Sequence, residues 1–226
     1  MCSSAPSPWE QAPLGPDLPL REVHVWQTSV DNWSGVHDEL SEEERARAAR
    51  FRFARDRRRW VAARTLVRRV LARYLGVETK GLVLGAHDDG RPLVLLPREA
   101  DWLSFSLSHA GDVAVVAVTR DQRVGVDVER VRSDVDVVAV AHRAFGEAIA
   151  NELAGETEPR RSQRFFEVWT REEARGKCRG TGLIEPDDPR RLDAPAVTDL
   201  RVGKGYAAAL AGAFQPEDVR LCVVAL

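Results

Sequence analysis

The sequence of 226 residues predicts an α+β fold of two similar halves, mainly because one order of secondary-structure patterns occurs twice. A strand-like run at residues 23–26 is followed by helical periodicity and then by several short strands. After residue 123 a strand, two helical stretches and a closing pair of strands follow. This predicts a flexible tail at residues 1–20, an N-terminal α+β half at 21–122 and a C-terminal α+β half at 123–226.

The first half contains a long helical stretch. Ser41 followed by three glutamates is typical of a helix start, and we expect the helix to run through the arginine-rich segment that follows. Between residues 60 and 74 the apolar side chains recur at helical spacing, which predicts a core-facing side and an arginine-lined outer face. Gly76 is a suitable residue to end this helix.

Short strands complete the first half and lead into the second. Residues 82–84 and 92–95 form a predicted hairpin, whose turn through Asp88, Asp89 and Gly90 presents Arg91. Residues 105–109 form another strand, and we expect residues 113–118 and 124–128 to pair through a turn at residues 120–122. Helices are predicted at residues 137–153 and 163–179, and closing strands at residues 206–214 and 219–226.

Composition excludes some classes of protein. The net charge is −2, but twelve arginines and one acid lie between residues 45 and 75, so this segment should attract anions. No zinc, helix-turn-helix or RNA-recognition pattern accompanies it, which disfavours nucleic acid as the ligand. Three cysteines at unrelated spacings argue against a disulfide framework and favour the cytoplasm. We expect neither a signal peptide nor a membrane helix, since no apolar run reaches the ~18 residues required.

Two acids predict a metal site in the middle of the chain. Asp127 and Glu129 lie two residues apart in a strand-like run, so their carboxylates project from one face, roughly 6.5 Å apart. The ordinary alternative is a solvated strand face. Gly125 favours the functional interpretation, because it allows another group to approach the backbone closely.

A third acid lies on the predicted helix at residues 163–179. Glu173 follows Trp169 by four residues and precedes Lys177 by four, which places an aromatic residue, an acid and a base along one stripe. An exposed ion pair between Glu173 and Lys177 is the plain alternative. The shared face with Trp169 instead places the carboxylate near the buried seam, where it needs a metal or a basic partner. Three acids and a lysine suggest Mg²⁺-assisted phosphate chemistry.

Ser108 and His109 are adjacent, which at first suggests a nucleophile beside a base. Neighbouring residues of a strand point to opposite faces, so a hydrolase dyad is disfavoured, and no Gly-x-Ser-x-Gly motif is present. For His109 two interpretations stay open, a structural side chain or a phosphate contact.

Taken together, the motifs resemble the 4'-phosphopantetheinyl transferase superfamily, in its large monomeric surfactin-synthetase-activating type. The resemblance extends from about Ser41 to Lys177 and beyond, which is most of the chain. Five motifs carry it in the family's order and spacing. They are Phe-Arg-Phe-Ala-Arg-Asp at 51–56, Gly-Arg-Pro at 90–92, Phe-Ser-Leu-Ser-His at 105–109, Gly-Val-Asp-Val-Glu at 125–129, and residues 169–177 with Gly-Thr-Gly-Leu at 180–183.

This resemblance implies an enzyme that transfers the phosphopantetheine arm of coenzyme A to a serine of an acyl or peptidyl carrier protein, releasing adenosine 3',5'-bisphosphate. It implies a pseudo-dimer of two α/β halves with the active site in the cleft between them, and a cytoplasmic monomer serving polyketide, nonribosomal peptide or fatty acid biosynthesis. Carrier recognition is expected along the cleft and the helix after residue 137.

The resemblance also implies roles for individual residues. Asp127, Glu129 and Glu173 would hold Mg²⁺ on the pyrophosphate, and Glu173 would act as base toward the carrier serine. Lys177 would neutralise or protonate the leaving phosphate, and His109 would bind phosphate oxygens together with Ser108. The positions that match nucleotide contacts, including those to its 3'-phosphate, are Arg47, Gly90 and Arg91.

Three departures from the family pattern leave alternatives open. Glu172 stands where the family usually has lysine, Ser106 where it often has asparagine, and Glu44 where some members carry a phosphate-binding lysine. If Glu172 pointed into the cleft, coenzyme A binding would weaken. A catalytically silent relative that binds coenzyme A or a carrier is therefore the first alternative, and a nucleic-acid-binding module is a distant second.

Overall fold

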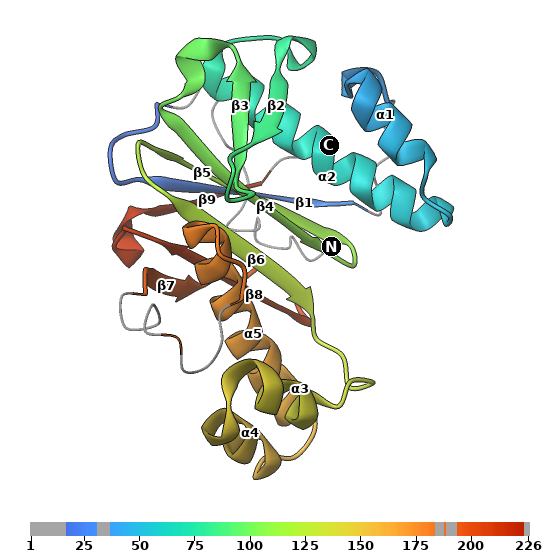
Figure 1. The fold of residues 1–226 in the computed structure, drawn as a ribbon, viewed down its shortest axis with the longest axis vertical. Helices are drawn as coiled ribbons and strands as arrows, with labels where there is room; N and C mark the ends of the chain where they lie inside the picture. The colour runs from blue at the N-terminus through green and yellow to red at the C-terminus, as the bar shows by residue number, and fades with distance from the viewer. Residues whose placement is uncertain (1–16, 31–36, 184–187, 189–193, 224–226) are drawn as a thin grey trace, which may run out of the picture.

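The computed structural model describes residues 17–30, 37–183, 188 and 194–223, and confirms a mixed α+β architecture (Figure 1). The first sheet has the strand order β4-β5-β1-β9, the second has the order β6-β8-β7, and β2 and β3 form a separate hairpin. The strands are β1 (Val23–Ser29), β2 (Val83–Ala86), β3 (Pro92–Leu96), β4 (Leu103–Ala110), β5 (Val113–Arg120), β6 (Val124–Arg130), β7 (Ala196–Asp199), β8 (Tyr206–Gly212) and β9 (Val219–Val223). The α-helices are α1 (Glu42–Ala49), α2 (Ala54–Leu75), α3 (Val137–Phe145), α4 (Glu147–Ala154) and α5 (Arg160–Arg179).

The two sheets repeat one connection pattern. In the first, β1 pairs antiparallel with β5 and β5 pairs antiparallel with β4, and helices α1 and α2 lie between β1 and β4 in the sequence. In the second, β6 pairs antiparallel with β8 and β8 with β7, and helices α3 to α5 lie between β6 and β7. The order of strand, helices and strand pair therefore gives the same three-stranded arrangement twice.

The last strand crosses between the sheets. β9 pairs parallel with β1, so it lies at the edge of the first sheet although the sequence analysis assigned it to the second half. The predicted closing strand 219–226 is confirmed as far as residue 223, and its last three residues lie outside the described part. Of the predicted flexible tail, residues 1–16 also lie outside it, whereas Leu18 is buried in the core with 2% of its surface exposed.

The predicted pairing of residues 113–118 with 124–128 is wrong. Both sides of β5 are occupied within the first sheet, by β4 and by β1, so β6 pairs with β8 instead. The two sheets still contact each other, because two serine side chains of β4 form hydrogen bonds to the backbone of β6 in place of backbone-to-backbone pairing. The hydroxyl oxygens of Ser106 and Ser108 accept hydrogen bonds from the backbone N–H groups of Val126 and Val128, at 3.1 and 3.3 Å.

The arginine-rich segment forms two helices where the sequence predicted one. Ser41 caps α1 in a capping box with Glu44, as its sequence suggests. The chain then turns at residues 50–53, and Phe53 adopts an extended conformation, with φ −105° and ψ 131°, before α2 begins. Phe51 in this turn packs on Trp60, with ring centroids 5.8 Å apart, so burial of an aromatic side chain fixes the break. Gly76 ends α2 in the left-handed conformation, as predicted.

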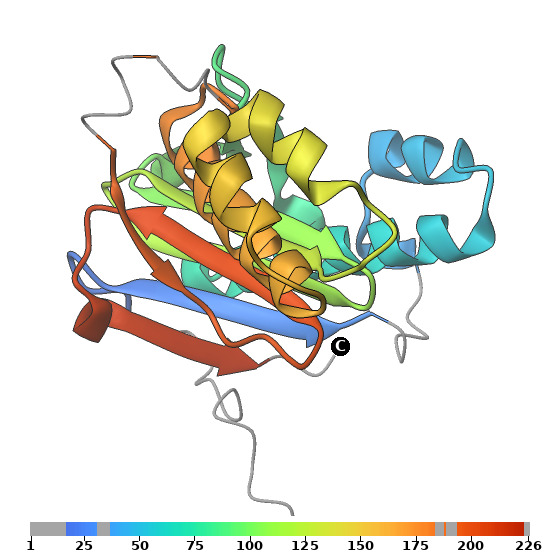
Figure 2. The same cartoon turned by 90° about the horizontal axis from the view of Figure 1, so that it is seen from below.

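Helix α5 covers the second sheet, and α3 and α4 pack against α5 (Figure 2). The predicted helix 137–153 is divided into α3 and α4 at Gly146, whose φ of +87° is the reason for the break. α5 packs on β6 at Gly125, where a Cβ atom would lie 2.0 Å from the carbonyl oxygen of Ala174. Close approach at Gly125 is thus confirmed, and the group that approaches is the backbone of α5. Among the described residues, no helix combines the length and the apolarity required to cross a membrane.

Candidate active site

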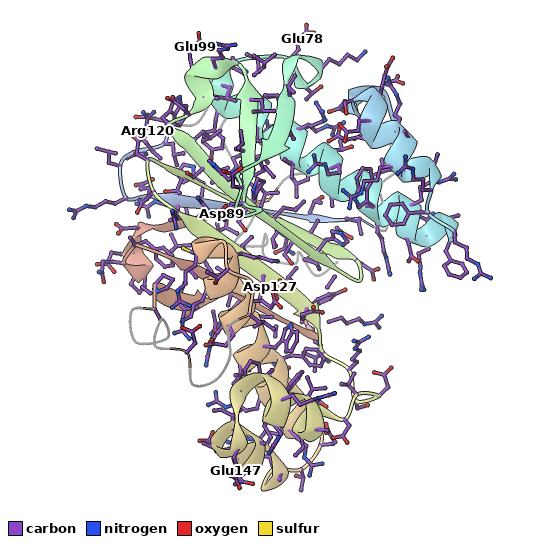
Figure 3. The ribbon with its side chains drawn as sticks, viewed as in Figure 1. Glu78, Asp89, Glu99, Arg120, Asp127 and Glu147 are labelled. Atoms are coloured by element: carbon purple, nitrogen blue, oxygen red, sulfur yellow. The ribbon has the colours of Figure 1, made fainter. Side chains whose placement is uncertain are left out.

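Asp127 of β6 lies at the centre of the molecule, where the two sheets meet (Figure 3). Only 4% of its surface is exposed. One carboxylate oxygen, Oδ1, accepts hydrogen bonds from Lys177 Nζ at 2.7 Å and from the Ser108 hydroxyl at 2.9 Å. The other oxygen, Oδ2, is buried and has no hydrogen-bond partner among the described residues. A buried carboxylate oxygen without a partner is costly, so this atom is poised for a ligand.

Lys177 connects this strand to α5. Its ammonium group also donates to the carbonyl oxygen of Val126 at 3.2 Å, and its side chain is 31% exposed. The partner of Lys177 is therefore Asp127, whereas the plain alternative from the sequence paired the lysine with Glu173 on its own helix. A lysine held by a buried carboxylate beside an open space is a fixed positive charge for an anionic ligand.

Glu129 and Glu173 lie close enough to Asp127 to feel its charge. The pKa of the Glu129 carboxyl is raised, first by burial and then by Asp127. The pKa of Glu173 is raised by the same two causes in the same order, and Lys177 opposes the shift. The structure thus places Glu129 of β6 and Glu173 of α5 within electrostatic range of Asp127, and a cation would stabilise the negative charge of these acids.

The donor set fits a hard divalent cation. Carboxylate oxygens are the ligands that Mg²⁺ prefers, and the buried Asp127 Oδ2 accepts no hydrogen bond from any described residue. Among the described residues no three His, Cys, Asp or Glu side chains already gather as a complete metal site. Ligation by all three acids therefore stays a prediction.

A cavity of about 370 Å³ opens beside Lys177 and is lined by both halves of the chain. The predicted nucleotide contacts Gly90 and Arg91 lie in its wall, and Arg91 Nε donates to Asp89 Oδ2 at 2.8 Å. Cations from three segments, which are Arg64, Arg91 and Lys177, line this space. The remaining lining residues are Asp89, Pro92, Phe105, Ser106, Leu107, Val124, Gly176, Gly180 and Gly182.

His109 faces a second cavity, of about 610 Å³, that also contains Arg59 and Glu129. The pKa of His109 is lowered, first by burial and then by the charges of Lys177 and Arg59, which favours a neutral imidazole at pH 7. Ser108, by contrast, donates to Asp127. The two neighbours therefore point to different surroundings, as the strand geometry predicts, and form no dyad.

Arg47 is the one predicted nucleotide contact that the structure does not bring to either cavity. Its guanidinium lies over the Trp60 ring, 5.5 Å from the centroid, on the exposed side of α1. The residues that line its own surface cavity are Glu43, Ala46, Arg50 and Phe51. Arg47 thus stacks on the buried Trp60 of α2 and lines neither of the two cavities near Asp127 and Lys177.

Glu44 is part of a buried network between α1 and α2. It is 7% exposed and accepts from Arg64 Nε at 2.8 Å and from Arg68 Nε at 2.6 Å, while the Ser41 N–H also donates to it. Burial alone would raise the pKa of Glu44, but these partners hold it below its ordinary value. Glu44 therefore orients Arg64, which lines the cavity beside Lys177.

Glu172 forms an ion pair within α5. Its Oε1 lies 2.5 Å from Arg175 Nη1, one helical turn further along. An anion where the family usually has a cation is thus matched by a neighbouring guanidinium.

Arg59 and Arg64 line the two cavities and were missed by sequence reasoning. Both belong to the twelve-arginine segment, whose charge marked an anion-binding region without indicating which side chains face inward. The position of each arginine around the helix relative to the buried Trp60 could have indicated which arginines face inward.

Comparisons with known proteins identify the family of the chain. Residues 24–121 match the family model for the N-terminal part of 4'-phosphopantetheinyl transferases, and residues 123–223 match that of the 4'-phosphopantetheinyl transferase superfamily. The chain is 33% identical over 200 residues to the 4'-phosphopantetheinyl transferase HetI of Nostoc sp., covering 81% of this chain and 84% of that protein.

Other relatives are covered less fully. Identity to the 4'-phosphopantetheinyl transferase psf-1 of Bacillus pumilus is 33% over 144 residues, which is 64% of this chain and 59% of that protein. Identity to the L-aminoadipate-semialdehyde dehydrogenase-phosphopantetheinyl transferase of Xenopus laevis is 28% over 189 residues, or 80% and 62%. The long match to HetI and the two adjoining family models show that the chain belongs to the 4'-phosphopantetheinyl transferase superfamily.

Proposed function

We propose that this enzyme transfers the 4'-phosphopantetheine arm of coenzyme A to a serine of an acyl or peptidyl carrier protein and releases adenosine 3',5'-bisphosphate. The observation that carries the proposal is Asp127, a buried carboxylate. One of its oxygens is bound to Lys177 and Ser108, and the other has no partner in the part of the chain that the structure describes. It lies between two acids of raised pKa and beside a cavity lined with cations. Phosphoryl transfer requires this combination of charges.

The fold supports a pseudo-dimeric enzyme whose active site lies in the cleft between two similar halves. The repeated strand order favours two related halves that meet near residue 123 in the sequence. The last strand, β9, follows the second half in the sequence but lies in the first sheet. The cavity beside Lys177 is lined by residues from both halves. Those of the first half lie between residues 64 and 107 of the sequence, and those of the second half between residues 124 and 182. A substrate in this cavity would contact both halves at once.

Coenzyme A would bind through its phosphates. Arg64, Arg91 and Lys177 supply positive charge to one cavity, and Arg59 with a neutral His109 supplies donors to the other. Asp127 lies between Ser108 of β4 and Lys177 of α5, so an anionic substrate near Lys177 also lies near the acids.

Asp127, Glu129 and Glu173 would hold a magnesium ion, with Asp127 Oδ2 as the buried ligand. When bound, this ion neutralises negative charge on the pyrophosphate oxygens. Its positive charge would also lower the pKa values of Glu129 and Glu173, which burial raises first and the charge of Asp127 second.

The transfer itself exchanges one P–O bond for another. The carrier serine oxygen attacks the β-phosphorus of coenzyme A, and the bond from that phosphorus to the bridging oxygen breaks. Glu173, in its ionised form, accepts the serine proton, and burial strengthens it as a base by raising its pKa. Lys177, fixed by Asp127, stabilises the charge that develops on the leaving phosphate.

The direct test measures the released nucleotide. Wild-type protein with coenzyme A, Mg²⁺ and an apo carrier should form adenosine 3',5'-bisphosphate in step with carrier modification. A carrier whose acceptor serine is replaced by alanine is the control and should give none. Coenzyme A binding without nucleotide release from any carrier would favour the silent relative.

The nucleic-acid alternative has a different signature. It requires DNA affinity that falls steeply with salt and that coenzyme A does not compete for. The surfactin-type subclass, the monomeric state, a cytoplasmic location and the biosynthetic pathway served stay predictions.

A further inference from the structure

The turn between α1 and α2 carries a basic surface that the proposed transfer chemistry does not use. We call residues 50–58 the α1–α2 corner. One acid, Asp56, lies in it, and its contact to Arg55 is long, at 3.9 Å. Among the described residues Arg50, Arg57 and Arg58 have no carboxylate partner, and the rest of the chain is net acidic. The exposed arginines of the corner are Arg50, Arg52, Arg55, Arg57 and Arg58.

An aromatic side chain stands in the middle of these charges. Phe53 is 60% exposed, although its neighbour Phe51 packs on Trp60. The Arg52 guanidinium lies 5.3 Å from the centroid of the Phe53 ring. Phe53 precedes α2 but makes no side-chain capping bond. The exposed ring therefore contributes little buried area to the core, and exposed aromatic and arginine side chains together are typical of binding hot spots.

The corner borders the cavity that contains His109. Arg59, the next residue, forms an ion pair with Asp112 in the β4–β5 turn and lines that cavity with His109 and Glu129. Arg55 lies one helical turn before Arg59 and shares its face of α2. The start of α2 accordingly lies beside the tip of the β4–β5 hairpin, near the end of β6 (Figure 1). A partner seated on the corner would reach the opening of the site.

We propose that the α1–α2 corner is a docking surface for the carrier protein, with Phe53 as the apolar anchor and the arginines bound to an acidic face of the carrier. This inference rests on the proposed function, which requires a protein as acceptor. Coenzyme A is not the occupant, because the corner arginines line neither of the two cavities near Asp127. A long nucleic acid is disfavoured, because the net acidic remainder of the chain would repel it.

The test separates carrier binding from coenzyme A binding. The triple variant Arg52→Glu, Arg55→Glu, Arg57→Glu should raise the KM for an apo acyl carrier protein at least about tenfold, because reversed charges repel the acidic face. The kcat at saturating carrier and the KM for coenzyme A should stay unchanged. Phe53→Ala should raise the carrier KM as well.

A matched control reverses exposed charges elsewhere. Lys80→Glu with Arg98→Glu alters the end of the molecule where Glu78 and Glu99 lie, away from the corner (Figure 3), and should leave the carrier KM unchanged. The salt dependence of the carrier KM should weaken only in the corner variant.

Several outcomes would overturn the inference. An unchanged carrier KM in the triple variant, with wild-type turnover, would remove the docking role and leave the proposed function intact. A raised KM for coenzyme A instead would assign the corner to the nucleotide. Loss of DNA binding in the triple variant at unchanged carrier KM would assign it to nucleic acid. No transfer by the wild-type protein would overturn the proposed function and this inference with it.

Discussion

Buried charge is the main feature at the scale of single residues. Asp127 and Glu44 are both nearly inaccessible, at 4% and 7% exposure, yet their partners differ. Glu44 is bound by Arg64, Arg68 and Ser41, which is the pattern of a structural ion pair. Asp127 has one oxygen with no hydrogen-bond partner among the described residues, which is the pattern of a ligand-binding carboxylate. We therefore expect opposite consequences when each carboxylate is made neutral.

Asp127→Asn should remove transfer and leave the fold intact. The amide oxygen can still accept from Ser108, but the charge that fixes Lys177 and would bind Mg²⁺ is lost. We expect kcat/KM to fall at least about a hundredfold, with little change in melting temperature. The exposed Asp101→Asn is the matched control. Activity retained by the Asp127 variant at limiting Mg²⁺ would contradict the metal assignment.

Glu44→Gln should destabilise the protein at neutral pH. Arg68, 2% exposed, would keep a buried charge without its carboxylate, and such losses cost about 3–5 kcal/mol of the free energy of unfolding. Exposed Glu42→Gln in the same helix is the control and should change little. Urea unfolding of the wild type and both variants measures the difference.

The pH dependence of that difference follows from the pKa of Glu44. Its folded-state pKa lies below the ordinary 4.5, so the contribution of Glu44 is complete above pH 4.5. It should be lost as the pH falls through the lowered folded-state pKa. The gap in unfolding free energy between wild type and Glu44→Gln should therefore be constant from neutral pH down to about pH 5 and shrink below 4.5. A gap that grows on acidification would contradict the assignment.

At the scale of elements, local signals gave correct positions and tertiary contacts decided the rest. The helix start at Ser41, the stop at Gly76 and the β2–β3 hairpin have sequence causes within a few residues, and all were predicted. The break after α1 and the pairing of β6 were not. Each depends on a tertiary contact. Phe51 packs on Trp60 of the next helix, and β6 pairs with β8 far along the chain, and such contacts leave no periodic signal.

Gly125→Ala should break the packing of α5 on β6. The added Cβ would lie 2.0 Å from the backbone oxygen of Ala174 and 2.5 Å from the backbone nitrogen of Cys178, and neither atom is a flexible side-chain end. We expect a loss of about 3 kcal/mol or more in the free energy of unfolding, measured in urea. Gly81→Ala is the control, because nothing lies within 4 Å of its added Cβ. Equal stability of the two variants would contradict this account of the contact.

At the scale of the whole molecule, the candidate site depends on residues from both halves. Asp127, Glu173 and Lys177 could be predicted because strand and helix periodicities place their side chains on defined faces. Arg59 and Arg64 could not, because a run of twelve arginines hides which ones face inward. Arg47 was assigned from the resemblance alone; its guanidinium lies over Trp60, outside the two cavities near Asp127, and its nucleotide contact stays a prediction. The pairing of β9 with β1 could not be predicted either, because the two strands lie at opposite ends of the described chain and no local sequence pattern indicates the contact.

The most direct test of the central claim is the intact mass of an apo carrier protein after incubation with this protein, coenzyme A and Mg²⁺. Transfer of one phosphopantetheine arm predicts a gain of about 340 Da on the carrier, which chelator and the Asp127→Asn variant should both abolish. An unchanged carrier mass across fatty acid, polyketide and peptide carriers, with coenzyme A still bound by the wild-type protein, would contradict it.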